Sequence, residues 1–106
     1  MGFDIELQNE RGDCVDQTGD PHNLLHRMLP SAIDTSFQIL RFIDWYGNTT
    51  LNNRQVRVFL VEWDRLSPLE DSPAIREESI QLLESIRSLA KRALTEPHQY
   101  LKFIGD

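Results

Sequence analysis

The sequence is poor in the residues from which the commonest specialised sites are built. Its single cysteine, Cys14, excludes an internal disulfide and a cysteine-based zinc site. The longest apolar run, Val58–Val61, falls far short of the ~20 residues that cross a membrane. The N-terminus lacks the basic and apolar regions of a secretory signal. We therefore expect a cytoplasmic protein that does not contact membranes.

The motifs of familiar enzymes are also missing. The five glycines are scattered singly, so no glycine-rich phosphate loop is present. No nucleophile elbow and no pair of catalytic carboxylates at a recognisable spacing occurs. His22 and His26 are four residues apart, a spacing at which two imidazoles can share a metal on a helix, but no carboxylate stands between them. We expect no catalytic residue, no bound metal and no cofactor.

Basic residues are fewer than acidic ones, 11 against 17, for a formal net charge of −6. This balance argues against nucleic-acid binding, which needs a basic surface. Residues 1–20 hold most of the excess, with one arginine among their acids. The segment is either a solvated strand face and loop or an acidic surface for a basic partner. Its acidic residues are Asp4, Glu6, Glu10, Asp13, Asp16 and Asp20.

The two ends of the chain carry strand patterns. Apolar and polar residues alternate over 3–8, and a turn with Gly12 follows, with a short return strand at Cys14–Val15. The end of the chain, 99–104, has the pattern of a final strand. Asp20 and Pro21 resemble an N-cap and the first residue of a helix that Pro30 ends.

The middle of the chain predicts two further helices. Residues 36–44 are apolar on both strand faces, which leaves a buried strand and an irregular buried segment as open alternatives. A loop over 44–50 supplies a threonine cap, and helical spacing continues to residue 66. The clearest helix spans 74–94, begun by Ser72 and Pro73.

These elements fit one α+β domain over residues 1–106. We expect a small antiparallel sheet that includes both terminal strands and is covered by two or three helices. A lone final strand would leave its backbone groups unpaired, and the first strand is the best neighbour available to it.

Two segments are unusual for a purely structural role: the loop from Asp44 to Thr49, and Pro97 to Asp106. Together they resemble a family of small uncharacterised bacterial proteins, whose signature reads Asp-Pro-Tyr-Gly-Asp-Thr, then Asn, and later Pro-His-x-Tyr-x-x-Phe-x-Gly-Asp. The sequence departs from it at Trp45 and Asn48. The positions that match are Asp44, Tyr46, Gly47, Thr49, Asn52, Pro97, His98, Tyr100, Phe103, Gly105 and Asp106.

The resemblance implies no known activity, but size and composition are similar to those of immunity proteins, which neutralise bacterial toxins. We therefore expect a small acidic, non-enzymatic protein-binding module. Its partner would be another protein, with a homodimer closed by Trp45 or Trp63 as an alternative. The predicted binding residues are Asp44, Trp45, Tyr46, Asn48, Thr49, His98 and Tyr100.

A hydrolase or ligand-binding protein that uses Asp44, Tyr46 and His98 is the other alternative. It requires the three side chains to converge. We predict that the end of the chain packs beside the Asp44–Thr49 loop, with His98 close to Asp44 or Tyr46, because loops collect at the ends of sheets.

Overall fold

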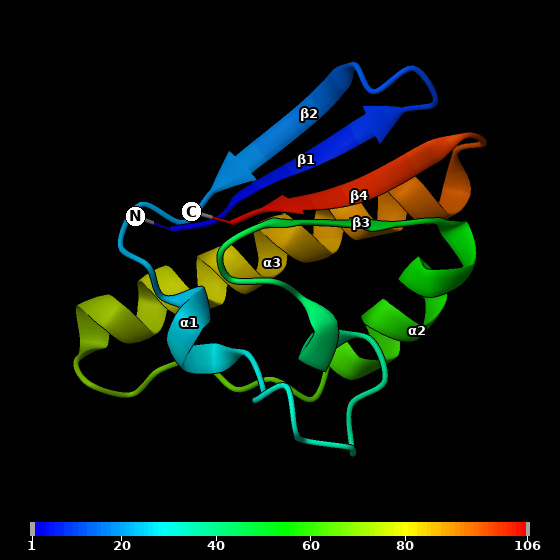
Figure 1. Ribbon diagram of the computed structural model, residues 1–106. Helices are drawn as coiled ribbons and strands as arrows, with labels where there is room; N and C mark the ends of the chain where they lie inside the picture. The colour runs from blue at the N-terminus through cyan, green and yellow to red at the C-terminus, as the bar shows by residue number, and fades with distance from the viewer. Residues whose placement is uncertain (1, 106) are drawn as a thin grey trace.

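The computed structural model describes residues 2–105, so Asp106 of the predicted signature lies outside the described residues. The part described is an α+β fold with a four-stranded antiparallel sheet and three α-helices, as the sequence predicts (Figure 1). In chain order the elements are β1 (Asp4–Asn9), β2 (Cys14–Gly19), α1 (Leu25–Met28), a 3₁₀ helix (Leu40–Phe42), β3 (Asn48–Leu51), α2 (Asn53–Trp63), α3 (Pro73–Thr95) and β4 (Gln99–Ile104).

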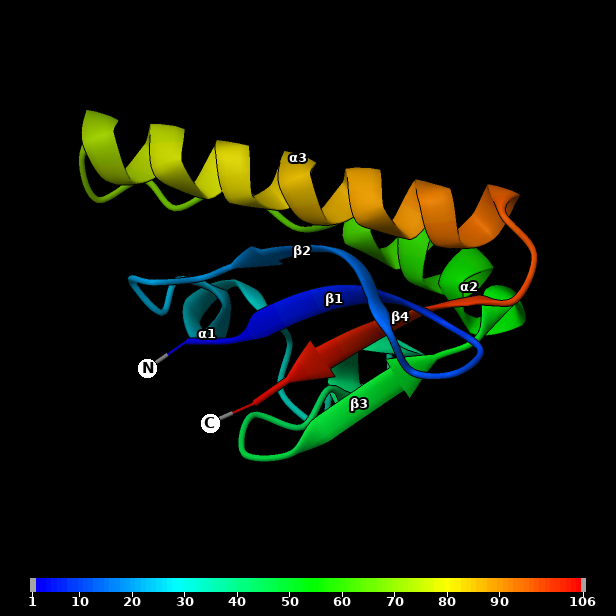
Figure 2. The same ribbon diagram turned by 90° about the horizontal axis from the view of Figure 1, so that it is seen from above.

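The sheet forms one layer and the helices form the other, in the strand order β2-β1-β4-β3. Helix α3 contacts β2, β1 and β4, and α2 contacts β4 and β3. Seen from above, no helix of residues 2–105 lies in front of the strands (Figure 2). The sheet therefore has one face in the core and one face open to solvent.

The predicted pairing of the two terminal strands is confirmed. β1 and β4 are antiparallel, with Ile5 opposite Phe103 and Leu7 opposite Leu101. All four side chains are fully buried, since alternate residues of a strand point to the same face. This pairing fixes the centre of the sheet and brings both ends of the chain to one side of the molecule.

Both edge strands differ from the prediction. β2 extends to Gly19, well past the expected Cys14–Val15 pair, with a bulge opposite Leu7 and Gln8. β3 occupies 48–51, although the sequence predicts a loop through residue 50, since residues 48–50 are all polar. Pairing with β4 makes it a strand, and that pairing is not encoded in local propensity.

The two long helices are confirmed, with one change of cap. Ser72 accepts a hydrogen bond from the Ile75 N–H at the start of α3, with Pro73 at the first helical position. At α2 the cap is Asn52 and not a threonine. Asn52 and Gln55 form a capping box in which each side chain accepts from the other residue's N–H. α2 ends at Trp63, earlier than predicted.

Helix α1 is much shorter than predicted. Pro21 and His22 lie in a turn, and Asn23 has a φ of 58°, which breaks any helix at that point. The N-cap residue is Leu24 and not Asp20, so the predicted cap position is wrong. The Asp20 carboxylate nevertheless accepts from the Leu24 and Leu25 N–H groups, both at 2.8 Å. Asp20 and Pro21 are the first two residues of a turn that the Asn23 N–H closes on the Asp20 carbonyl, and they do not open a continuous helix.

Residues 36–44 form an irregular segment with one 3₁₀ turn and no strand, which excludes the buried-strand alternative. The segment is only partly buried: Phe37, Leu40 and Ile43 enter the core, whereas Phe42 is exposed. Glu62 of α2 is only 4% exposed and accepts hydrogen bonds from the backbone N–H groups of Gln38, Ile39 and Leu40. A carboxylate on another element thus satisfies the donors that a strand would have paired.

The core lies between the helices and the inner face of the sheet. Phe59 and Trp63 of α2 stack with their centroids 4.9 Å apart, and Phe103 of β4 packs against both. Trp63 is fully buried and donates its indole N–H to the Leu83 carbonyl at 3.0 Å. The homodimer hypothesis is therefore wrong for Trp63.

No helix of residues 2–105 is both long and apolar enough to cross a membrane.

Candidate functional site

The loop from Asp44 to Thr49 closes on its own side chains. Asp44 Oδ1 accepts from the Tyr46 N–H at 2.9 Å, and the Asp44 N–H donates to Thr49 Oγ1 at 2.9 Å. A Cβ on Gly47 would lie 2.6 Å from Asp44 Oδ2, so glycine leaves room for the Asp44 side chain in this position. Asp44 and Thr49 thus hold the turn, while exposed Asn48 begins β3.

The end of the chain reinforces this loop. The Gly105 N–H donates to the Gly47 carbonyl at 2.6 Å, one residue beyond the pair that Asn48 makes with Ile104. A Cβ on Gly105 would lie 2.5 Å from the Trp45 carbonyl oxygen. The two signature segments therefore meet, through Gly47 and Gly105.

An open hollow of ≈ 520 Å³ adjoins this loop, and we call it the aromatic groove. Phe42 is 62% exposed and Tyr46 is 79% exposed, although both side chains are largely apolar. The guanidinium of Arg41 lies 4.2 Å from the centroid of the Phe42 ring. The lining residues are Ser31, Ala32, Arg41, Phe42, Ile43, Asp44, Trp45 and Tyr46.

Trp45 forms a fixed wall of the groove. Its ring lies 4.6 Å from the ring of His26 in α1, and the His26 ring packs edge-on against buried Phe3 at 5.5 Å. The three rings link β1, α1 and the loop. This stacking holds Trp45 partly buried, so the wall is already in place before any ligand arrives.

The other wall is fixed by Glu62 of α2 and by Arg65, which follows that helix. Glu62 holds the backbone of residues 38–40 immediately before Phe42. Arg65 donates to the Ser36 carbonyl at 2.6 Å and lies 4.0 Å from the centroid of the Phe37 ring. The groove is therefore built from irregular backbone that Glu62 and Arg65 anchor at several points.

His98 does not join this site, and the predicted composite surface is wrong on this point. Asn48 pairs with Ile104 and Leu51 with Leu101, so the Asp44–Thr49 loop lies at the end of β4 that Ile104 occupies. His98 precedes the other end, about 20 Å away along the strand. It is exposed there, with Nδ1 3.6 Å from Glu10 Oε2.

Tyr100 lies near His98, at the same end of β4. Both line a smaller hollow of ≈ 280 Å³ with Asn52, Asn53, Arg54 and Gln99. Tyr100 is half-buried and pairs with Gln8 of β1. The predicted binding residues thus divide into two groups at opposite ends of β4, and the hydrolase alternative loses the convergence it required.

The acidic N-terminal residues do not form one surface either. Asp16 lies on the helix side and pairs with Arg92 at 2.7 Å, and Asp20 is buried and accepts from backbone N–H groups at the start of α1. Glu10 and Asp13 belong to the hairpin between β1 and β2. Asp4 and Glu6 lie on strand positions that alternate with buried Ile5 and Leu7, so they occupy the open face.

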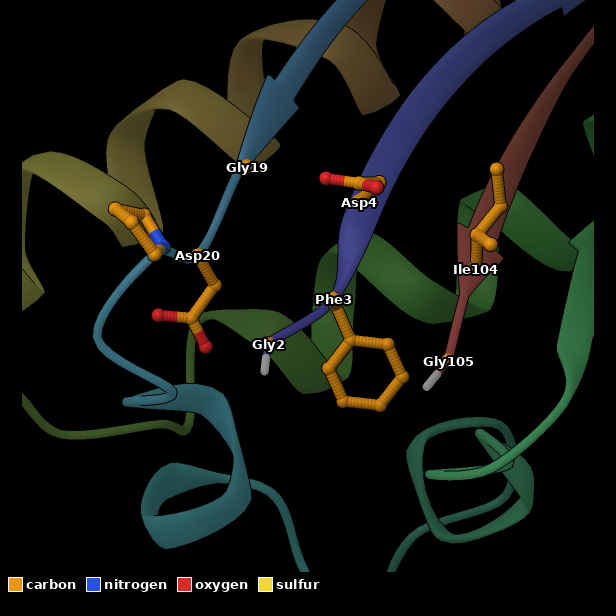
Figure 3. Close-up of a pocket in the computed structure, with 8 residues that line it drawn as sticks. Gly2, Phe3, Asp4, Gly19, Asp20, Ile104 and Gly105 are labelled. Carbon is orange, nitrogen blue, oxygen red and sulfur yellow. The ribbon is translucent and has the colours of Figure 1, made fainter.

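A second hollow, of ≈ 460 Å³, lies at the end of the sheet where β1, β2 and β4 meet. Two carboxylates line it. Figure 3 shows Asp20 directed to the start of α1 and Asp4 directed toward Gly19. The two side chains do not converge, so this hollow offers no paired carboxylates for a cation or for acid–base chemistry.

The two histidines and the cysteine that the sequence offered as candidate metal ligands or nucleophile do not form a site either. His22 is exposed and pairs with Glu78 of α3, whereas His26 is held between rings, so the two histidines do not face one ion. No cluster of three metal-ligating side chains occurs among residues 2–105. Partial desolvation and the carboxylates of Glu6 and Asp16 raise the pKa of the Cys14 thiol, which disfavours the reactive thiolate.

Sequence reasoning missed Arg41 and Phe42 of the groove, as well as Ser31 and Ala32. The available signal was the excess of apolar residues on both faces of 36–44, more than one buried segment can accommodate.

Comparisons with protein-family models, curated proteins and solved structures find no match. The resemblance carried by the two signature segments stays a prediction.

Proposed function

We propose that the protein is a non-enzymatic protein-binding module and that the aromatic groove is its contact surface. The observation that carries this proposal is the exposure of Phe42 and Tyr46 beside a preformed hollow. Each aromatic side chain left in water forgoes about 2 kcal/mol of transfer free energy. A partner that inserts an apolar side chain between them recovers it, and aromatic residues dominate the energetics of such contacts.

Charge indicates the kind of partner. The chain carries a net charge of −6, which attracts a basic protein and speeds encounter at low ionic strength. Arg41 and Asp44 line the same groove and provide polar contacts that fix orientation. Neutralisation of a basic bacterial toxin, as by an immunity protein, is the most concrete form of this function.

Capture experiments with matched variants test the proposal. Phe42→Ala combined with Tyr46→Ala removes both exposed rings without touching a buried side chain, so the variant is expected to fold. Val15→Ala is the control, since Val15 is 43% exposed on β2 and does not line the groove. Wild-type protein and the control are expected to retain one specific protein from the source organism at physiological salt, and the double variant is expected to lose it.

Two outcomes would overturn the proposal. One is retention of the same protein by the double variant, which would place the contact elsewhere. The other is light scattering that shows a dimer dissociated by the same two substitutions, because the groove would then be closed by a second copy of the chain.

A further inference from the structure

Helix α2 presents a solvent-facing side whose composition is unlike that of the rest of the chain. At 100° per residue, Arg54, Val58 and Val61 point directly away from the buried residues Val56 and Phe59. Arg57 lies beside them. We call these four residues, Arg54, Arg57, Val58 and Val61, the α2 face; none of them lines the aromatic groove.

Valine is an unfavourable residue at these two exposed helical positions. Val58 is 39% exposed and Val61 is 69% exposed, so core packing does not account for Val61 and accounts only in part for Val58. β-Branched residues lose side-chain freedom in a helix, and lysine, glutamate or alanine would stabilise an exposed helical position better. One turn apart, the two valines form an apolar strip that another surface can cover.

The charge of the α2 face is opposite to that of the whole molecule. Arg54 and Arg57 are both exposed, and among residues 2–105 neither forms an ion pair. The only acidic residue in α2 is Glu62, which is buried and bonded to the loop before Phe42. Two uncompensated positive charges therefore flank the apolar strip in a chain of net charge −6.

We propose that the α2 face is a second docking surface, for an acidic amphipathic segment of a partner protein. Carboxylates of that segment would pair with Arg54 and Arg57, where guanidinium groups favour bidentate contacts, and its apolar side chains would cover Val58 and Val61. The proposal does not depend on the aromatic groove, which is expected to favour a basic partner.

A peptide titration followed by NMR tests this proposal. The probe is a synthetic amphipathic helix of glutamate, alanine and leucine, and its counterpart carries lysine in place of glutamate. The acidic peptide is expected to shift the amide signals of residues 54–61, and the lysine peptide is expected to leave them unchanged. Shifts confined to other elements, or equal binding of both peptides, would overturn the proposal.

Three variants sharpen the test. Arg54→Glu combined with Arg57→Glu is expected to weaken binding of the acidic peptide by about tenfold or more, because like charges would then face each other. Val61→Ala is expected to weaken it without lowering the melting temperature, since Val61 is 69% exposed and alanine favours the helix. Lys91→Glu reverses an exposed charge on α3 and is expected to change nothing. Unchanged affinity in both α2 variants would refute the proposal, as would self-association through this face.

Discussion

At the scale of single residues, buried polar contacts position the aromatic groove. Glu62 and Asp20 are both nearly inaccessible to water, and each accepts backbone N–H groups from an irregular segment or a short helix. A buried carboxylate in such a place is retained because it satisfies donors that would otherwise be unpaired. The groove therefore depends on residues that do not line it.

Glu62→Ala is expected to lower the free energy of unfolding by about 3 kcal/mol or more, because three backbone N–H groups lose their acceptor. Glu62→Gln keeps one acceptor oxygen and is expected to cost less. Urea denaturation measures both, with Glu77→Ala on the exposed side of α3 as the control. Equal midpoints for the alanine variants at 62 and 77 would show that the loop does not need its anchor.

Gly105→Ala is expected to destabilise the fold by about 2 kcal/mol, and Gly47→Ala by about 1 kcal/mol. The difference arises because a Cβ on Gly105 meets the backbone carbonyls of Trp45 and Gly47, at 2.5 and 2.7 Å. A Cβ on Gly47 meets only the Asp44 side chain, which can rotate away. Thermal unfolding of the two variants checks the order, and the reverse order would contradict the packing of the chain end on the loop.

At the scale of elements, α3 carries most of the helical side of the core. Its inward stripe is continuous over its length and packs on three strands as well as α2. The buried residues are Ser79, Leu82, Leu83, Ile86, Leu89, Ala90 and Ala93. Tertiary burial of this stripe, rather than helix propensity, stabilises the element.

Leu83→Ala is expected to lower the free energy of unfolding by ~2 to 5 kcal/mol, since Leu83 is 7% exposed at the centre of this stripe and truncation leaves a cavity. The Leu83 carbonyl that accepts the Trp63 indole is unaffected by the substitution. Ser88→Ala, on the exposed side of the same helix, is the matched control. A chemical-denaturation midpoint that moves no further for Leu83→Ala than for Ser88→Ala would be inconsistent with this packing.

At the scale of the whole molecule, hydrogen bonds to aspartate carboxylates, one of them between distant segments, make stability depend on pH. A hydrogen bond from Arg27 in α1 lowers the pKa of Asp71, which precedes α3, and a hydrogen bond from Ser36 lowers the pKa of Asp34. In both cases the folded protein binds its proton less tightly than the unfolded chain does. The stability these groups contribute is thus present at neutral pH and is lost as the pH falls through the folded pKa values.

The melting temperature is therefore expected to fall on acidification below about pH 4. Asp71→Asn is expected to lower the melting temperature at neutral pH and to reduce its dependence on pH in the acidic range. Asp4→Asn, on the open face of the sheet, is the control. If the variant at Asp71 and wild type lose stability in parallel down to that range, the Arg27–Asp71 contact does not contribute to acid sensitivity.

The sequence by itself determined the elements whose signals are local and repeated. Three signals identify an element without reference to the rest of the chain. They are the alternation of apolar and polar residues in β1 and β4, the long apolar stripe of α3 and the serine–proline start at Ser72. The pairing of β1 with β4 followed as well, because a strand's backbone groups need a partner and few candidates exist in a short chain.

Features that depend on contacts between residues distant in the sequence were decided only by the tertiary structure. β3 is a strand because β4 pairs with it, and the fold of 36–44 depends on Glu62, which is distant in sequence. Because β3 and β4 are antiparallel, His98 lies at the end of β4 opposite to the Asp44–Thr49 loop, and Gly105 lies against Gly47 instead. Strand direction and register are set by the whole sheet, so the groove beside Phe42 could not be located from local pattern.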